Sequence, residues 1–223
     1  MPQSGRRPAD PPAPGAPAAT ALLTVEFQRG VVGEASALPE LAREARDSGM
    51  LARVAALVDA AHGAGVQVLH AVAERRPDGR GTGANARLFR AAARLPVRQL
   101  TGSPAVEVAP PIRVAEEDLV VRRLHGLSPL AGTGVDALLR NLGIRTLVVV
   151  GVSANIAVPN TVFDAVNLGY EAVVPADAVA GVPAAYTADV LRHTLALVAT
   201  LTTTDALTAR WAAEGAANAP GPH

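Results

Sequence analysis

Short apolar runs alternate with longer helical patterns along this chain, and the alternation limits the folds that the chain can adopt. Six runs have strand character: 21–25, 66–70, 119–121, 146–150, 171–174 and 201–204. Between them lie stretches of helical composition and spacing: 38–62, 135–141, 159–168 and 184–199. Continuous apolar strands separated by helices are typical of a parallel sheet covered on both faces. We therefore expect an α/β fold, a three-layer α/β/α sandwich around a six-stranded, mostly parallel sheet.

The two ends of the chain differ in composition from the part between them. Residues 1–20 hold six prolines and show no apolar periodicity, which predicts a disordered tail, and residues 214–223 predict a second one. We expect residues 21–213 to form one domain, because no repeat or interior linker divides them. No apolar run reaches the roughly 20 residues of a membrane span or resembles a signal peptide, so we expect a cytoplasmic protein without a membrane partner.

The basic residues of the chain are all arginine, and cysteine is absent. The 20 arginines balance 20 acidic residues. This composition excludes disulfides, cysteine nucleophiles, Schiff-base lysines and a phosphate loop with its lysine. Zero net charge argues against a nucleic-acid partner. Dispersed histidines and the lack of a G-x-G-x-x-G motif predict neither a metal site nor a cofactor, and the glycine-rich stretch 79–83 predicts a mobile loop.

Polar residues follow three of the predicted strands, at the sheet edge where ligands of such folds bind. Glu26 comes directly after the first strand, where a carboxylate can act as an acid or a base. Arg122, Arg123 and His125 follow the third strand, and guanidinium groups suit carboxylates. After the fourth strand, the backbone N–H groups of Ile156 and Ala157 open a helix and could stabilise an anion or a developing oxyanion.

Each of these segments also has an ordinary structural interpretation. Glu26 could cap a turn or pair with Arg29, and the arginines after the third strand could pair with the acidic residues 116–118. The segment 151–161 could be a simple strand-to-helix turn. A different site, built from His125, Ser128 and His70 with Ser128 and His125 as a nucleophile–base pair, competes with a structural role for Ser128 in a turn.

Taken together, these segments resemble the isochorismatase-like superfamily, also called the cysteine hydrolases, over most of residues 21–206. The segment 25–28 (Val-Glu-Phe-Gln) resembles the family's apolar-apolar-Asp-x-Gln signature, and 122–133 resembles its Lys-x-x-x-Ser-x-Phe-x-x-Thr region. The segment 147–177 resembles its nucleophile loop and the strand that follows, with a glycine, a polar turn, a helix, Gly-Tyr and a closing Asp-Ala at the family's spacing.

The resemblance implies where the site lies. The family's catalytic Asp, Lys and Cys fall at Glu26, Arg123 and Ala157, with Arg122 as the alternative at the lysine position. Ala157 has no nucleophilic atom, so thioester chemistry is excluded there. Substrate contacts are expected from Arg122, His125, Asn155, Ile156 and Gln28. The family also has a cis peptide bond in its nucleophile loop, which here would precede Ser153.

The resemblance implies a function as well. Isochorismatases proper lack a nucleophile and hydrolyse a vinyl ether by acid catalysis. We therefore expect a hydrolase or lyase that acts on a small, anionic, carboxylated metabolite without a cysteine, with Glu26 as the acid or the base. The alternative is a catalytically inactive member of the family that binds a small molecule or serves as a partner subunit. The resemblance also implies a homo-oligomer.

Overall fold

A parallel sheet forms the middle layer of the computed structural model, which describes residues 16–217. Its strand order is β3-β2-β1-β4-β5-β7, and a short strand, β6, pairs with β4. All of the pairings are parallel. The strands are β1 (Thr20–Val25), β2 (Gln67–Ala73), β3 (Leu119–Arg123), β4 (Thr146–Val152), β5 (Glu171–Pro175), β6 (Val179–Ala180) and β7 (Thr200–Thr202). The predicted three-layer α/β fold is confirmed, with β6 as an additional strand.

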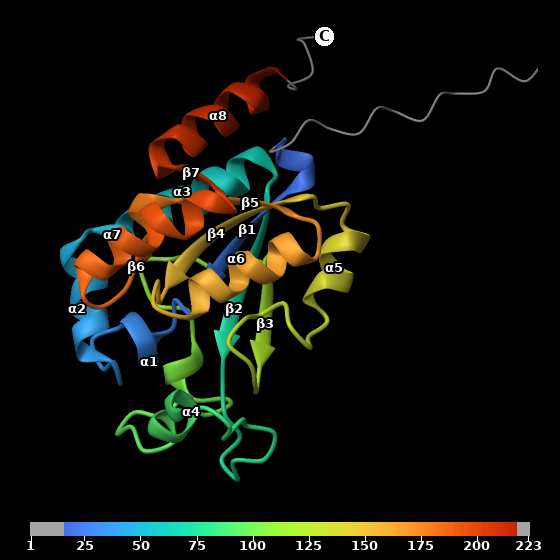
Figure 1. Cartoon of the computed structure of the whole chain (residues 1–223). Helices are drawn as coiled ribbons and strands as arrows, with labels where there is room; N and C mark the ends of the chain where they lie inside the picture. Colours follow the sequence, from blue (N-terminus) through green and yellow to red (C-terminus); the bar gives the residue numbers. More distant parts are fainter. Residues whose placement is uncertain (1–15, 218–223) are drawn as a thin grey trace, which may run out of the picture.

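Helices cover both faces of the sheet (Figure 1). One face packs against α5 (Val135–Asn141), α6 (Ala157–Asn167) and α7 (Ala184–His193). The other face packs against α1 (Arg29–Val32), α2 (Pro39–Asp47), α3 (Met50–Ala64) and α8 (Thr204–Ala217). Consecutive residues of a strand place their side chains on opposite faces of the sheet. Leu23 thus belongs to the first core and Leu22 to the second. No helix among residues 16–217 is both long and apolar enough to cross a bilayer.

The remaining helix and the 3₁₀ turns lie in the connections. Helix α4 (Arg87–Ala92) stands beyond the carboxyl ends of β1, β2 and β3 (Figure 1). The 3₁₀ turns are η1 (Pro17–Ala19), η2 (Pro104–Val106), η3 (Ala176–Ala178) and η4 (Leu195–Leu197). The sequence patterns predict neither α1 nor α4, because both are short and α4 buries none of its residues.

Several predicted boundaries shift in the structure. The predicted helix 38–62 is two helices, because Gly49 adopts a left-handed conformation with φ 72° between α2 and α3. The predicted helix 184–199 ends at His193. The turn η1 and Thr20, the first residue of β1, lie inside the predicted N-terminal tail, and α8 continues to Ala217, past the predicted boundary at 213. Residues 1–15 and 218–223 of the predicted tails lie outside the described residues.

The order of the strands reverses between β1 and β4, and this switch point is where open α/β sheets bind ligands. Gly151 makes the close approach of the two strands possible. Its φ is 140°, and an added Cβ would overlap the carbonyl oxygen of Val25. Only glycine fits this position, so the sequence fixes how tightly the carboxyl ends of β1 and β4 approach.

Candidate active site

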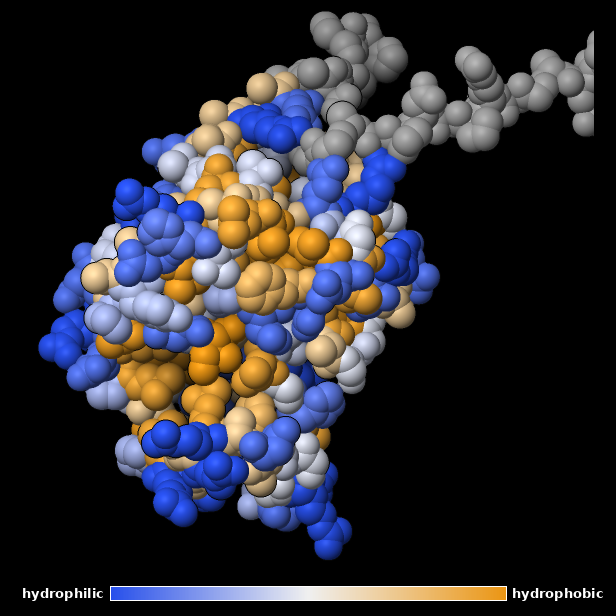
Figure 2. Space-filling model, viewed as in Figure 1, coloured by the Kyte–Doolittle hydropathy of each residue, from blue (hydrophilic) through white to orange (hydrophobic). Residues whose placement is uncertain are grey.

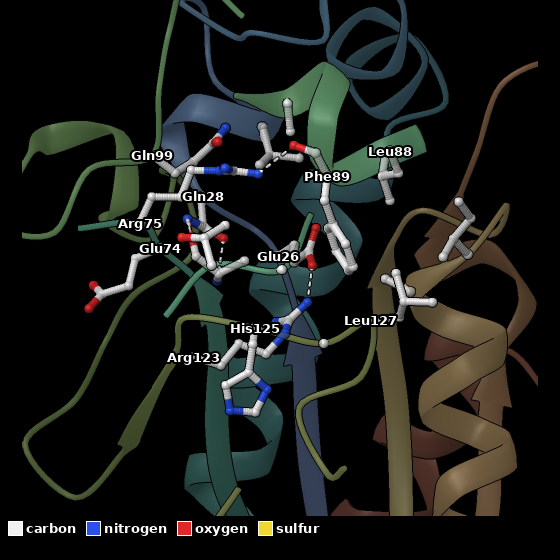
Figure 3. A pocket seen from close by; sticks show the side chains of 18 of the residues that line it. Glu26, Gln28, Glu74, Arg75, Leu88, Phe89, Gln99, Arg123, His125 and Leu127 are labelled. Carbon is white, nitrogen blue, oxygen red and sulfur yellow. Dashed lines mark hydrogen bonds and ion pairs between the residues drawn. The ribbon is translucent and has the colours of Figure 1, made fainter. Parts of the chain in front are cut away.

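A cavity of about 250 Å³ lies at the carboxyl edge of the sheet, beside the switch point. Its lining includes Glu26, which follows β1, and Arg123, the last residue of β3. Ser153, Ile156 and Ala157, which follow β4, line it as well. The three strand ends that carry the predicted site therefore meet at one cavity (Figure 3). They meet because parallel strands present all of their carboxyl ends at the same edge.

Glu26 is held in an unusual backbone conformation. Its φ is 57°, and it is the one residue other than glycine with a positive φ among residues 16–217. This conformation costs a residue with a Cβ about 1 to 3 kcal/mol. The Glu26 N–H donates to the Ala71 carbonyl at 2.9 Å, and its own carbonyl accepts from the Gln28 N–H at 2.8 Å. The neighbouring strand thus stabilises the strained turn that carries the carboxylate.

Arg123 forms an ion pair with Glu26 at the base of the cavity (Figure 3). Its Nη2 donates to Glu26 Oε1, and the arginine side chain is only 4% exposed. The other two guanidinium nitrogens, Nε and Nη1, are buried and have no hydrogen-bond partner. Buried donors without partners are costly and rare, so these nitrogens mark a place for an acceptor group.

Apolar side chains form most of the cavity wall. They come from α1 and α2, from α4 and the residues after it, and from the loops after β3 and β4: Val31, Leu38, Leu41, Leu88, Phe89, Ala91, Ala92, Leu95, Leu124, Leu127 and Ile156. Figure 2 shows hydrophobic surface between the body of the sandwich and the segment that carries α4. An apolar wall with a few polar groups is typical of small-molecule sites.

Ala157 and Ile156 stand at the start of α6. Ala157 lines the cavity and is the first residue of the helix, so its N–H has no partner within the helix. The Ile156 N–H donates to the Ser153 carbonyl at 3.2 Å. The Ala157 N–H is therefore the donor that remains of the predicted pair. The peptide bond between Val152 and Ser153 is cis, as the resemblance implies.

The structure separates the two candidate arginines. Arg122 is exposed, pairs with Glu74 at 3.3 Å and does not line the cavity, whereas Arg123 contacts Glu26. The ion pairs proposed as ordinary interpretations do not form among the described residues: Arg29 pairs with Glu107 at 3.2 Å, and the partners of Arg122 and Arg123 are Glu74 and Glu26.

Three further candidate residues differ in their surroundings. His125 is exposed and lines the cavity. Gln28 lines it too, but it is fully buried and its amide makes two hydrogen bonds of 2.8 Å with the backbone of Ala73. Asn155 does not line the cavity, and its amide bonds to both backbone groups of Val182. Gln28 and Asn155 thus hold the loops that surround the site.

The alternative arrangement around Ser128 does not form. Ser128 is fully buried, and its hydroxyl accepts a hydrogen bond from the Leu130 N–H at 3.1 Å, as expected for a turn serine. Both ring nitrogens of His70 are engaged, one with Thr24 at 2.9 Å and one with Asp118 at 3.1 Å. Among residues 16–217, no hydrogen bond joins Ser128 to an imidazole, and no group of three or more His, Asp or Glu side chains could hold a metal ion.

One part of the cavity lining, supplied by α4 and the loop 79–83, is not predicted by the sequence patterns. Helix α4 and the loop 79–83 supply Leu88, Phe89 and Thr82 to the lining. Arg75 also lines it; burial lowers its pKa, and its Nη2 donates to the Phe89 carbonyl at 3.1 Å. The apolar residues between the arginines of 87–95 were the available signal, but their pattern is too short to indicate a helix.

Known proteins share this architecture. The family model "Isochorismatase domain" matches residues 20–206. The chain is 31% identical over 159 residues to a streptothricin hydrolase of Streptomyces noursei, a match that covers 71% of this chain and 48% of that protein. The chain thus spans about half the length of this curated relative.

Solved structures agree on the fold. A cysteine hydrolase from Pseudomonas syringae pv. phaseolicola 1448A superposes with a TM-score of 0.77 at 25% identity, over 89% of this chain and 94% of that chain. N-carbamoylsarcosine amidase from Thermoplasma acidophilum superposes with a TM-score of 0.66 at 24% identity, over 83% and 96%. The second likeness shows the fold alone.

Proposed function

Because the chain belongs to the isochorismatase family, we propose that it hydrolyses a small carboxylated molecule without a covalent enzyme intermediate. The observation that carries this proposal is the incomplete hydrogen bonding of the Arg123 guanidinium group. One guanidinium nitrogen of Arg123 holds the Glu26 carboxylate, and two others are buried in the cavity lining without a partner. A substrate carboxylate that accepts from one of these donors would lie next to Glu26.

In the proposed reaction the attacking group is water. The resemblance places the family's cysteine at Ala157, whose methyl side chain cannot attack a carbonyl, and the chain contains no cysteine at all. Glu26 faces a permanent positive charge, which suits a carboxylate that accepts a proton. We therefore assign Glu26 the role of general base in the first step.

The proposed reaction balances with water and substrate alone. Glu26 removes a proton from water while the water oxygen forms a bond to the electrophilic carbon of the substrate. The Ala157 N–H donates to the oxygen on which negative charge develops. The bond to the leaving group then breaks, and Glu26 returns the proton to that group. No hydrogen bond among the described residues engages Glu26 Oε2, which leaves this oxygen open to the water.

Turnover of a panel of substrates tests the proposal. The panel consists of small amides and esters that carry a carboxylate, each offered to the wild type, to Glu26→Gln and to Glu171→Gln. Glu171 is exposed at the amino end of β5, so its variant controls for the loss of a charge. Removal of a general base lowers the rate by about 10²- to 10⁴-fold. Equal rates for the wild type and Glu26→Gln would remove Glu26 from the mechanism.

A binding protein is the second candidate, and the methyl group of Ala157 at the nucleophile position favours it. A binding protein would be stabilised against heat by a panel member without releasing product. This result would replace the proposed hydrolysis with binding alone. The cytoplasmic location remains a prediction.

A further inference from the structure

Buried polar side-chain atoms without a hydrogen-bond partner are concentrated in the cavity. Among the described residues there are five such atoms, and three of them belong to Arg123 and Thr82, which line the cavity. The other two belong to Asp164 and Thr187, which do not line it. Because proteins pair nearly all of their buried polar groups, such a cluster indicates that a ligand supplies the missing partners.

Thr82 is the member of this cluster that neither the family resemblance nor the proposed reaction uses. It stands in the glycine-rich loop 79–83, and its backbone N–H donates to the Gly79 carbonyl at 3.4 Å. Its hydroxyl oxygen is buried and makes no hydrogen bond to another described residue. A hydroxyl can both donate and accept, so it can bind a hydroxyl, a carbonyl or an amide group of a ligand.

The wall beside Thr82 is flat and apolar. A Cβ added to Gly83 would lie 3.1 Å from the ring of Phe89, so the loop backbone packs directly against that ring. In the view of Figure 3 the Phe89 ring lies between the Glu26–Arg123 pair and the side chains of Leu88 and Leu127. The bond from Arg75 to the Phe89 carbonyl fixes this wall in place.

We infer that Thr82 is a substrate-binding residue and that the substrate carries, besides its carboxylate, a second hydrogen-bonding group joined to it by a flat apolar body. The carboxylate binds Arg123, the apolar body contacts Phe89 and the second group binds the Thr82 hydroxyl. A cavity of about 250 Å³ has room for a body of one ring. This inference rests on the proposed function for the assignment of the carboxylate to Arg123.

The stability of Thr82→Val separates a ligand-binding role from a structural one. Valine keeps the shape of threonine and removes the hydroxyl. Because this hydroxyl bonds to no other described residue, we expect the midpoint of urea unfolding to stay unchanged or to rise. Thr208→Val on α8 is the matched control, since Thr208 does not line the cavity. A clear fall in the midpoint for Thr82→Val alone would show a structural role and overturn the inference.

Calorimetric titration of the full chain with simple acids tests the binding role. The probes are acetate, benzoate, 3-hydroxybenzoate and 4-hydroxybenzoate. We expect benzoate to bind about tenfold more tightly than acetate because its ring is buried, and the better hydroxybenzoate to gain about a further fivefold. Thr82→Val should remove the hydroxybenzoate advantage and leave benzoate unchanged. Equal affinities of the wild type for benzoate and both hydroxybenzoates would overturn the inference.

The turnover assay and the titrations together distinguish this inference from the proposed function. If Glu26→Gln turns over the panel as fast as the wild type while the Thr82-dependent hydroxybenzoate advantage persists, the proposed reaction fails and the inference about the ligand stands. If turnover depends on Glu26 but Thr82→Val binds every probe as the wild type does, the reaction stands and the inference fails.

Discussion

At the scale of residues, the candidate site is built on Glu26 and Arg123, which line the cavity and form an ion pair. The sequence predicts that Glu26 and one of two arginines lie at the same edge of the sheet, because they follow apolar strands and parallel strands end at one edge. The choice between Arg122 and Arg123 could not be predicted. It depends on which side of the edge strand β3 each residue faces, and a shift of one residue in register reverses that side.

Arg123→Lys tests the importance of the guanidinium itself. Lysine keeps the charge but presents a single nitrogen, so it cannot hold Glu26 and a substrate carboxylate with separate planar donors. We expect the Kd for benzoate to rise about tenfold, measured by calorimetry. Arg122→Lys is the control, because Arg122 is exposed and does not line the cavity. Unchanged binding by Arg123→Lys would contradict an anchoring role for the guanidinium.

His70 makes the stability of the fold depend on pH. Burial lowers the pKa of His70 below 6.5, against the opposing influence of Asp118. Burial alone would raise the pKa of Asp118, but bonds from the Ala115 N–H and from His62 and His70 outweigh it and lower that pKa. The folded chain therefore resists protonation of His70 at a pH where the unfolded chain accepts the proton.

The free energy of unfolding should accordingly fall as the pH drops below about 6.5, where His70 of the unfolded chain becomes protonated. Urea denaturation between pH 7.5 and 5.5 measures the slope. His70→Asn should reduce that slope, and His193→Asn, at an exposed position of α7, should leave it as in the wild type. A free energy of unfolding that rises toward pH 5.5 would contradict the direction of the His70 shift.

At the scale of elements, the approach of β1 to β4 shapes the site. Gly151→Ala places a methyl group against the carbonyl oxygen of Val25, in a backbone conformation that alanine avoids. We expect the free energy of unfolding to fall by at least about 3 kcal/mol, measured by urea denaturation.

Gly63→Ala is the control for that change. Gly63 lies in α3, is exposed, and an added Cβ there would meet nothing within 4 Å. Alanine favours a helix over glycine by about 0.5 to 1 kcal/mol, so this variant should be slightly more stable. Equal effects of the two substitutions would show that the close approach at Gly151 is unimportant.

The elements differ in how far the sequence predicts them. β4 could be predicted because a continuous apolar run leaves few alternatives, and it is buried along its whole length. Helix α4 could not, because it buries no residue and makes no core contact that would impose a periodic pattern. For the same reason the sequence does not predict that Thr82 and Phe89 line the cavity.

The surface of the whole molecule bears on its association. Phe163 and Val166 on α6 and Leu197 in η4 are exposed, Leu197 by 81%. Figure 2 shows hydrophobic surface over this part of the molecule. Exposed apolar patches often mark contacts between proteins.

We therefore keep the prediction of a homo-oligomer. Light scattering coupled to size-exclusion chromatography should give a mass that is a multiple of 22.7 kDa. Phe163→Asp should shift that mass toward a single chain, while Glu171→Asp should not. A wild-type mass of one chain at high concentration would contradict the prediction.

Intact-protein mass spectrometry of the wild-type chain, quenched in acid during steady turnover of the best panel substrate, tests the non-covalent mechanism most directly. The chain has no cysteine, and water attacks the substrate in the proposed reaction. The predicted result is turnover with the mass of the unmodified protein throughout. An enzyme species heavier by the acyl or alkyl part of the substrate would contradict it and would reveal a nucleophile, Glu26 included.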